Sequence, residues 1–197
     1  MSPDYNLAAS LLGVTVAHVK AVAEVESAGS GFDSQGRVKI LFEPHLFHAE
    51  TKGKFARSYP LLSHPYELQK NRMSYQRNQY QVFDAACALD RRAAICACSW
   101  GRFQILGSHH KTLGIATALE FAEQMSMSEH QQLILFVAFI RANPQMLAAL
   151  KDQDWAGFAR RYNGPGYAAN AYDAKIKAAF SRHGEKQRNQ GRNESRG

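Results

Sequence analysis

The chain has 197 residues, of which 45% are hydrophobic and 21% charged, a balance typical of one soluble domain with a sizeable core. No segment approaches the roughly 20 uninterrupted apolar residues of a membrane helix, so we expect no membrane insertion. The formal net charge of +7 favours anionic partners, and both bacterial envelopes and nucleic acids are of that kind.

The N-terminal residues Met1–Tyr5 lack the basic start and apolar stretch of a secretory signal. We therefore expect synthesis in the cytoplasm, with delivery by another agent to any substrate outside the inner membrane. Cys87, Cys96 and Cys98 are an odd number of cysteines, which argues against a disulfide framework. We expect Cys96 and Cys98 to be small buried side chains.

The first part of the chain is predicted to form short helices and one strand. Apolar residues recur at helical spacing, and Thr15 is a suitable N-cap for the second helix. The run Val38–Phe42 is rich in β-branched and apolar residues, which predicts a strand in a small hairpin or sheet near residues 37–43. Residues 52–75, rich in Lys, Gly, Ser, Pro and Tyr, predict a long loop. The helices are expected over residues 4–12, 15–27 and 44–50.

The remainder is predicted to be helical, apart from an interruption at Ser99–Gly101. Ser128 with Gln131 three residues later is a capping-box signature, and the apolar helix that follows is expected to be the central buried helix. The polar, basic composition beyond Gly184 predicts disorder. We therefore expect one domain over residues 1–183 and a basic tail over 184–197. The helices are expected over residues 76–89, 91–98, 117–125, 128–143, 144–150, 154–161 and 169–182.

Glu26 is the first candidate for acid chemistry. On its predicted helix, Val22 and Val19 lie four and seven positions before it, so its side chain points along the apolar stripe. Burial disfavours the charged carboxylate and raises its pKa, as a proton donor at neutral pH requires. Glu24 instead shares a solvent face with Lys20. The alternative for Glu26 is a carboxylate at the edge of the core, bonded to nearby backbone.

Glu43 is the second carboxylate of interest. It follows the predicted strand and precedes Pro44, and a strand end that opens into a loop is a common place for a site residue. The alternative is that Glu43 caps the helix that begins at Pro44.

The segment Ser99–Ile105 combines flat apolar rings with hydrogen-bonding groups. Trp100 and Phe103 offer ring faces, and Ser99 and Gln104 offer polar groups, a mixture that suits a sugar. The alternative is a pair of core aromatics beside a turn.

The segment Arg161–Tyr167 has a tight turn directly after a helix. This turn presents Tyr162 and Asn163 at a defined edge. The alternative is an ordinary helix stop.

Taken in order, these segments read Glu-Ser, Gly-x-x-Gln and Tyr-Asn-Gly, which resembles the goose-type lysozyme and lytic transglycosylase superfamily. More closely, the chain resembles the phage-type N-acetylmuramidase family, whose members occur as endolysin catalytic domains. The resemblance extends over about residues 17–183. The matching stretches are Val25-Glu26-Ser27-x-Gly29-x-Gly31-Phe32, Ile40-Leu41-Phe42-Glu43-x-His45, Ser99-Trp100-Gly101-x-Phe103-Gln104-Ile105, Asp154-Trp155-x-x-Phe158-Ala159 and Tyr162-Asn163-Gly164-Pro165-Gly166-Tyr167.

This resemblance implies a mostly α, lysozyme-like (goose-type) domain with a small β element. It also implies a bacteriolytic muramidase that cleaves the β-1,4 bond between N-acetylmuramic acid and N-acetylglucosamine in peptidoglycan. Glu26 would be the general acid, and Glu43 the second carboxylate, as base or as electrostatic support. The residues expected to bind the sugars are Ser99, Trp100, Gln104, Tyr162, Asn163 and Tyr167.

The chain departs from the superfamily pattern at two places. Arg102-Phe103 replaces Leu-Met before Gln104, and Arg161 replaces the alanine before Tyr162. No separate peptidoglycan-binding module is visible, and we expect contact between the basic surface and the anionic cell envelope to substitute for it in part.

Two other functions are compatible with the sequence. A lytic transglycosylase would use a single acid/base glutamate and release 1,6-anhydro products. A non-catalytic binder of polyanions or cell wall would need only the positive charge. Since no basic run with interleaved aromatics occurs in the body of the chain, we expect no nucleic-acid partner.

The histidines form no recognisable metal motif, so we expect neither a metal nor another cofactor. We expect a monomer that reaches peptidoglycan through holin-type release or by injection.

Overall fold

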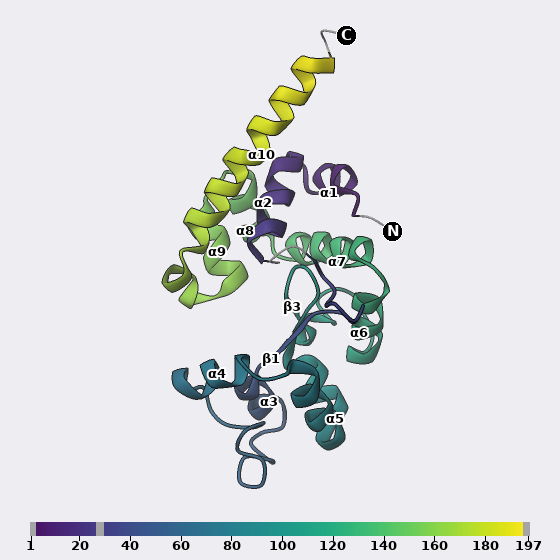
Figure 1. Cartoon of the computed structure of the whole chain (residues 1–197), viewed down its shortest axis with the longest axis vertical. Helices are drawn as coiled ribbons and strands as arrows, with labels where there is room; N and C mark the ends of the chain where they lie inside the picture. Colours follow the sequence, from purple (N-terminus) through teal and green to yellow (C-terminus); the bar gives the residue numbers. More distant parts are fainter. Residues whose placement is uncertain (1–2, 27–29, 195–197) are drawn as a thin grey trace. The chain divides into compact units, whose positions relative to one another are not determined.

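The computed structural model describes residues 3–26 and 30–194 of the chain. It is mostly helical with one small antiparallel sheet, which confirms the predicted fold class (Figure 1). The chain divides into two compact units. One comprises Met1–Gly29 with Leu133–Gly197, and the other comprises Ser30–Gln132. The single domain predicted over 1–183 stays a prediction.

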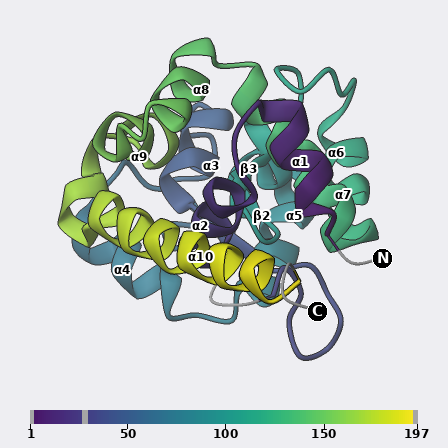
Figure 2. The ribbon, with the colours of Figure 1, turned by 90° about the horizontal axis from the view of Figure 1, so that it is seen from above.

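The first unit is built from helices. Helix α10 lies against α2 and α9, and its yellow ribbon runs alongside α2 in both views (Figures 1 and 2). The face of α2 that carries Val19 and Val22 is fully buried, as the apolar stripe predicted. The helices of this unit are α1 (Tyr5–Leu12), α2 (Val16–Glu26), α8 (Pro144–Lys151), α9 (Trp155–Asn163), the 3-10 helix η2 (Pro165–Asn170) and α10 (Tyr172–Glu194).

Helix α7 (Glu129–Arg141) begins in the second unit and continues into the first. The Ser128 hydroxyl accepts a hydrogen bond of 3.1 Å from the backbone N–H of Gln131, so the predicted cap is present. Leu133, Phe136 and Ile140 are fully buried, which places this helix in the core as expected.

The caps of the first unit follow the sequence closely. Asn143 accepts from the backbone N–H of Met146, and Asp154 accepts from that of Gly157. Thr15 lies directly before the first residue of α2, the position predicted for its N-cap, and the Thr15 hydroxyl lies 2.8 Å from Nδ1 of His18.

The second unit contains the sheet. Strands β1 (Ile40–Phe42), β2 (Cys98–Trp100) and β3 (Ile105–Leu106) pair antiparallel in that order, with Ile40 opposite Trp100. Helix α5 packs against β1 and α3, and α4 also contacts β1. The helices of this unit are α3 (Pro44–Glu50), α4 (Leu68–Tyr75), α5 (Gln79–Cys96), the 3-10 helix η1 (Gly107–His109) and α6 (Ala118–Met127).

Three sequence-based boundaries need correction. The expected loop over 52–75 ends in helix α4, because Leu68–Tyr75 packs against α3 and β1. Cys98 lies in β2 rather than in a helix, since pairing with Phe42 extends its backbone. Helix α10 continues to Glu194, so the backbone is helical where composition predicted a disordered tail. By contrast, the predicted break near residue 90 is confirmed by non-helical dihedral angles at Asp90.

A half-buried ion pair fixes two glycine-containing segments of the second unit. The Glu129 carboxylate accepts from the Gly31 backbone N–H at 2.7 Å and from Nη1 of Arg102 at 3.0 Å. The Gln132 side chain accepts from the Arg102 backbone N–H at 2.7 Å. A Cβ atom on Gly31 would lie 2.0 Å from Oε1 of Gln132, so this position accepts only glycine without rearrangement. Arg102, one of the departures from the superfamily pattern, thus anchors the loop that precedes the sheet.

In the described parts of the chain, no single helix is both long and apolar enough to cross a membrane. Two helix pairs pass that test only when taken together, and they are bent by 111° and 102° at their junctions.

Candidate active site

Glu26 is the last residue of α2, in the first unit. Burial raises the pKa of its carboxyl group to about 7, against a smaller opposing effect of a hydrogen bond from Asn163. The partial negative charge at the C-terminal end of a helix also disfavours a carboxylate. Glu26 therefore keeps its proton to a much higher pH than an ordinary carboxyl group. Ser27, its partner in the Glu-Ser motif, lies outside the described residues.

Asn163 ends α9, and its side chain reaches Glu26. Its Nδ2 donates a hydrogen bond of 3.1 Å to Oε1 of Glu26. Gly164 follows with φ of 77°, a left-handed conformation that ends the helix at this point. Asn163 is thus more than a helix stop, because it holds one oxygen of Glu26 and leaves the other as the site of the proton.

Two tyrosines lie near Glu26. Tyr162 stacks on Phe158 with ring centroids 5.5 Å apart, and Phe136 and Phe139 contact the same ring. Burial raises the pKa of Tyr162, and the charge of Glu26 raises it further. The Tyr162 ring therefore anchors the end of α9, which positions Asn163.

Tyr172, the first residue of α10, is a neighbour that the sequence did not reveal. Burial raises its pKa and the charge of Glu26 adds to this effect. No motif contains Tyr172, and only the packing of α10 on α2 brings it near Glu26. Tyr167 belongs to η2, and its ring contacts the Arg160 guanidinium at 5.8 Å.

Glu24 is exposed, as predicted, but its partner differs. It pairs with Arg182 and, at 2.9 Å, with His183 of α10, rather than with Lys20. These contacts hold the pKa of Glu24 below its usual value. Two carboxylates two positions apart on α2 therefore have opposite pKa shifts, because one is buried and the other is paired.

Glu43 lies in the second unit, between β1 and α3. It occupies the N-cap position of α3, but its side chain makes no capping bond. Instead, its Oε2 accepts a hydrogen bond of 2.6 Å from the Tyr75 hydroxyl. The Glu43 side chain therefore does not cap α3. Burial raises the pKa of Glu43, and the Tyr75 hydrogen bond opposes this effect.

His45 and Asn71 complete this cluster. Nδ2 of Asn71 lies 2.7 Å from Nδ1 of His45, and Oδ1 of Asn71 accepts from the Glu67 backbone, so Asn71 donates to the imidazole. Burial lowers the pKa of His45, and nearby His64 lowers it further. His45 is therefore neutral, and its 3.5 Å approach to Glu43 is a polar contact rather than an ion pair. Tyr75 and Asn71 were not among the site residues predicted from the sequence. Both lie in helix α4, which was predicted to be part of the loop over residues 52–75.

In the segment Ser99–Ile105, two of the candidate side chains lie in the core and two are partly exposed. Trp100 is 3% exposed and Phe103 is fully buried, so neither offers a ring face to a sugar, and the core alternative is right for both. The Trp100 indole N–H donates to Ile95 O at 3.1 Å. Ser99 and Gln104 remain partly exposed. Gln104 has φ of 47°, and its amide donates to Gly101 O at 2.9 Å.

No group of three or more His, Cys, Asp or Glu side chains suited to a metal ion occurs within residues 3–26 and 30–194. Each unit contains a partly buried carboxyl group held by a neutral hydrogen-bond donor, Glu26 in the first unit and Glu43 in the second. A protonated carboxyl and a hydrogen-bonded carboxylate are the groups that glycosidic cleavage uses.

Comparison with known proteins agrees with this chemistry. Residues 15–184 match the model of the N-acetylmuramidase family. The crystal structure of the Burkholderia AP3 phage endolysin superposes with a TM-score of 0.83 and 39% sequence identity, over 93% of this chain and 70% of the endolysin chain. No curated protein matches the sequence.

Proposed function

The chain belongs to the N-acetylmuramidase family of glycoside hydrolases, whose substrate is peptidoglycan, and on that basis we propose that Glu26 is its general acid. The bond cleaved is the β-1,4 linkage between N-acetylmuramic acid and N-acetylglucosamine. The single observation that carries the proposal is the carboxyl group of Glu26, whose pKa burial raises to about 7 while Asn163 donates a hydrogen bond to one of its oxygens.

The proton-transfer step follows from that hydrogen bond. Because Asn163 donates to Oε1, the acidic proton of Glu26 resides on Oε2. Transfer of this proton to the glycosidic oxygen accompanies cleavage of the bond to the departing sugar, while the other sugar develops oxocarbenium character. The transfer leaves Glu26 as a carboxylate, which the Asn163 amide then stabilises.

Glu43 is our proposed second carboxylate. The Tyr75 hydroxyl orients it and favours its ionised form, although burial opposes ionisation. As a carboxylate, Glu43 serves as the base for water or stabilises the developing positive charge.

The remaining candidate residues divide by exposure. Ser99, Gln104 and Tyr167 are partly exposed and are proposed to contact the sugars. Trp100 supports the strand from within the core and is not proposed as a sugar contact. Tyr162 and Asn163 act through Glu26.

The test is the substitution Glu26→Gln, which keeps the size of the side chain and removes the acidic proton. It should lower the rate of turbidity loss on purified sacculi by at least about 100-fold, the lower end of the range for general acid catalysis. Glu24→Gln is the matched control on the same helix and should retain activity near that of the wild type. Comparable lysis by Glu26→Gln and the wild type would refute the assignment.

Mass spectrometry of the released fragments tests the bond and the outcome together. Muramidase hydrolysis leaves N-acetylmuramic acid at the reducing end. Anhydro ends would instead assign the chain to the transglycosylase alternative.

Delivery and envelope contact are further parts of the proposal. The enzyme acts on cell-wall peptidoglycan, which we propose it reaches after holin-type release or injection. Its net charge of +7 draws it to the anionic envelope. That attraction should weaken as salt concentration increases.

A further inference from the structure

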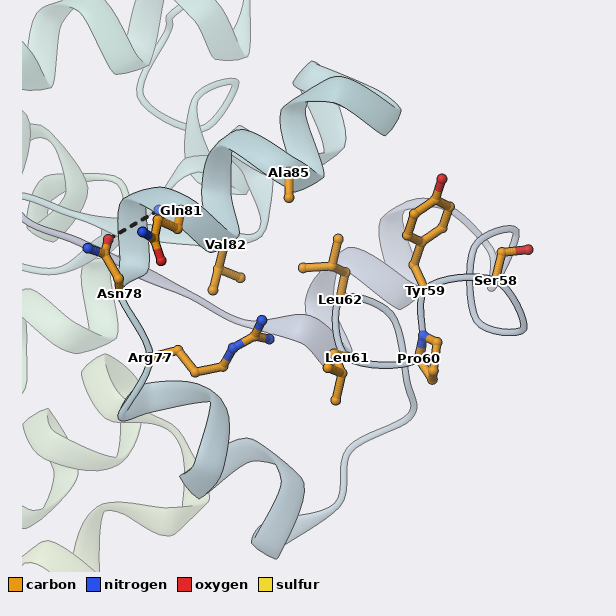
Figure 3. Close-up of a pocket in the computed structure, with 10 residues that line it drawn as sticks. All are labelled: Ser58, Tyr59, Pro60, Leu61, Leu62, Arg77, Asn78, Gln81, Val82 and Ala85. Atoms are coloured by element: carbon orange, nitrogen blue, oxygen red, sulfur yellow. Dashed lines mark hydrogen bonds between the residues drawn. The ribbon is translucent and has the colours of Figure 1, made fainter.

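A cavity of about 340 Å³ lies in the second unit (Figure 3), and its lining does not include Glu43 or Tyr75. It is formed by the loop before α4, the turn after α4 and the first turns of α5. The lining residues used below are Leu61, Leu62, Arg77, Asn78, Gln81 and Val82, with Ala85 at one edge.

The cavity has an apolar floor and one positive charge. Leu62 is 7% exposed and Val82 is 3% exposed, and in Figure 3 these two side chains point toward each other. Arg77 extends its guanidinium between Val82 and Leu61. Among the described residues, no carboxylate forms an ion pair with Arg77. An exposed guanidinium over an apolar floor is complementary to a ligand with a carboxylate beside small apolar groups.

The edge of the cavity carries two amide side chains. Oδ1 of Asn78 accepts from the backbone N–H of Gln81 at 3.2 Å, which fixes the Asn78 side chain and leaves its NH₂ group as a donor (Figure 3). The Gln81 amide offers both a donor and an acceptor. Peptide groups of a bound ligand would find partners in both.

Hydrogen bonds connect the residues that line the cavity to the donor of Glu43. Oε1 of Gln79 accepts from the backbone N–H of Phe42 at 2.9 Å, and its Nε2 donates to Arg77 O at 3.0 Å. Tyr75, two positions before Arg77, donates to Glu43. One hydrogen-bonded turn, 75–79, therefore fixes both Arg77 and the donor to Glu43.

We propose that this cavity, the Arg77 pocket, binds the short peptide that peptidoglycan carries on its sugars. The Arg77 guanidinium pairs with the terminal carboxylate, the alanine methyl groups pack on Leu62 and Val82, and the amides of Asn78 and Gln81 bond the peptide backbone. This assignment rests on peptidoglycan being the substrate, as in the proposed function, and makes the enzyme selective for peptide-bearing strands.

The binding test uses the wild-type chain and a stem peptide released from sacculi by an amidase. This probe has no glycosidic bond, so its binding does not depend on Glu26 chemistry. Titration followed by NMR should show binding of the free-carboxylate peptide, and amidation of that carboxylate should weaken binding by at least about tenfold, as expected for loss of a charge-assisted hydrogen bond. No binding, or equal binding of both peptides, would overturn the proposal.

Variants locate the site. Arg77→Gln should weaken peptide binding about tenfold, and Ala85→Phe should block the cavity with its charge intact. Arg91→Gln, at an exposed arginine of helix α5 outside the cavity, is the control and should bind as the wild type does. In the activity assay, Arg77→Gln should lower kcat/KM on peptide-bearing strands but not on peptide-stripped strands. An equal effect on both substrates would contradict a peptide site.

Discussion

The side-chain amide of Asn163 donates a hydrogen bond of 3.1 Å to the carboxyl group of Glu26, a residue 137 positions earlier in the chain. Burial of Glu26 raises its pKa to about 7 and this bond acts in the opposite direction. The acidity of Glu26 is therefore set by two opposed effects, one from the packing of α2 and one from the end of α9.

Removal of this donor by Asn163→Ala should alter the pH dependence of the reaction. Without the bond, the carboxylate loses stabilisation, the pKa of Glu26 rises, and the alkaline limb of kcat/KM moves to higher pH. The rate at the optimum should fall by about 10 to 100-fold, because the acid is less well positioned. Asn170→Ala, at an exposed position of η2, is the control and should leave the profile in place. If the alkaline limb is unchanged in Asn163→Ala, the hydrogen bond from Asn163 does not influence the pKa of Glu26 during the reaction.

Ionisation of Glu26 should lower the free energy of unfolding of the protein as the pH rises. Its folded-state pKa of about 7 exceeds the usual 4.5, so the folded chain binds more protons between these values than the unfolded chain. The free energy of unfolding should therefore decrease from pH 4.5 to 7 and then level off, with a contribution of up to about 3 kcal/mol. Glu26→Gln should unfold at higher urea concentration than the wild type at pH 8, and at a similar concentration at pH 4. Equal midpoints at pH 8 would show that ionisation of Glu26 costs little.

Tyr75→Phe tests whether Glu43 acts as a carboxylate. The Tyr75 hydroxyl favours the ionised form of Glu43, so its loss should raise the pKa of Glu43 further. If activity requires the carboxylate, the acidic limb of the pH–rate profile moves to higher pH. Tyr66→Phe, an exposed tyrosine of the same unit, is the comparison and should not shift this limb. Were both variants to share the wild-type profile, Glu43 would be a structural residue.

Glu129→Ala should destabilise the loop that precedes the sheet. The substitution removes the acceptor for Gly31 and the partner of Arg102, whose side chain is only 17% exposed. Loss of one partner from a largely buried pair should cost about 2 to 3 kcal/mol in the free energy of unfolding. Urea denaturation measures this cost, with Glu123→Ala on exposed α6 surface as the control. A cost below that of the control would mean that the ion pair contributes nothing net.

The local elements could be predicted because their causes are local. The capping side chain of Ser128, the apolar stripe on α2 and the β-branched run of β1 each depend on residues a few positions apart. Helix α4 was missed because its sequence is polar, and contacts with α3 and β1 support it rather than its own pattern.

The same division applies to the candidate site. The spacing of Glu26 from the buried Val19 and Val22 was enough to predict that desolvation raises its pKa. The amino-acid sequence could not show that Trp100 is enclosed by the rings of Phe83 and Phe121, which leaves it no free face for a sugar.

By itself, then, the sequence determined a mostly helical N-acetylmuramidase with a buried glutamate at the end of α2, since motif order and helical periodicity are written along the chain. Only the tertiary structure decided what holds each carboxylate. The donors Asn163 and Tyr75 reach Glu26 and Glu43 from 137 and 32 positions away. Contacts over such separations arise from the packing of whole helices, which no local pattern specifies.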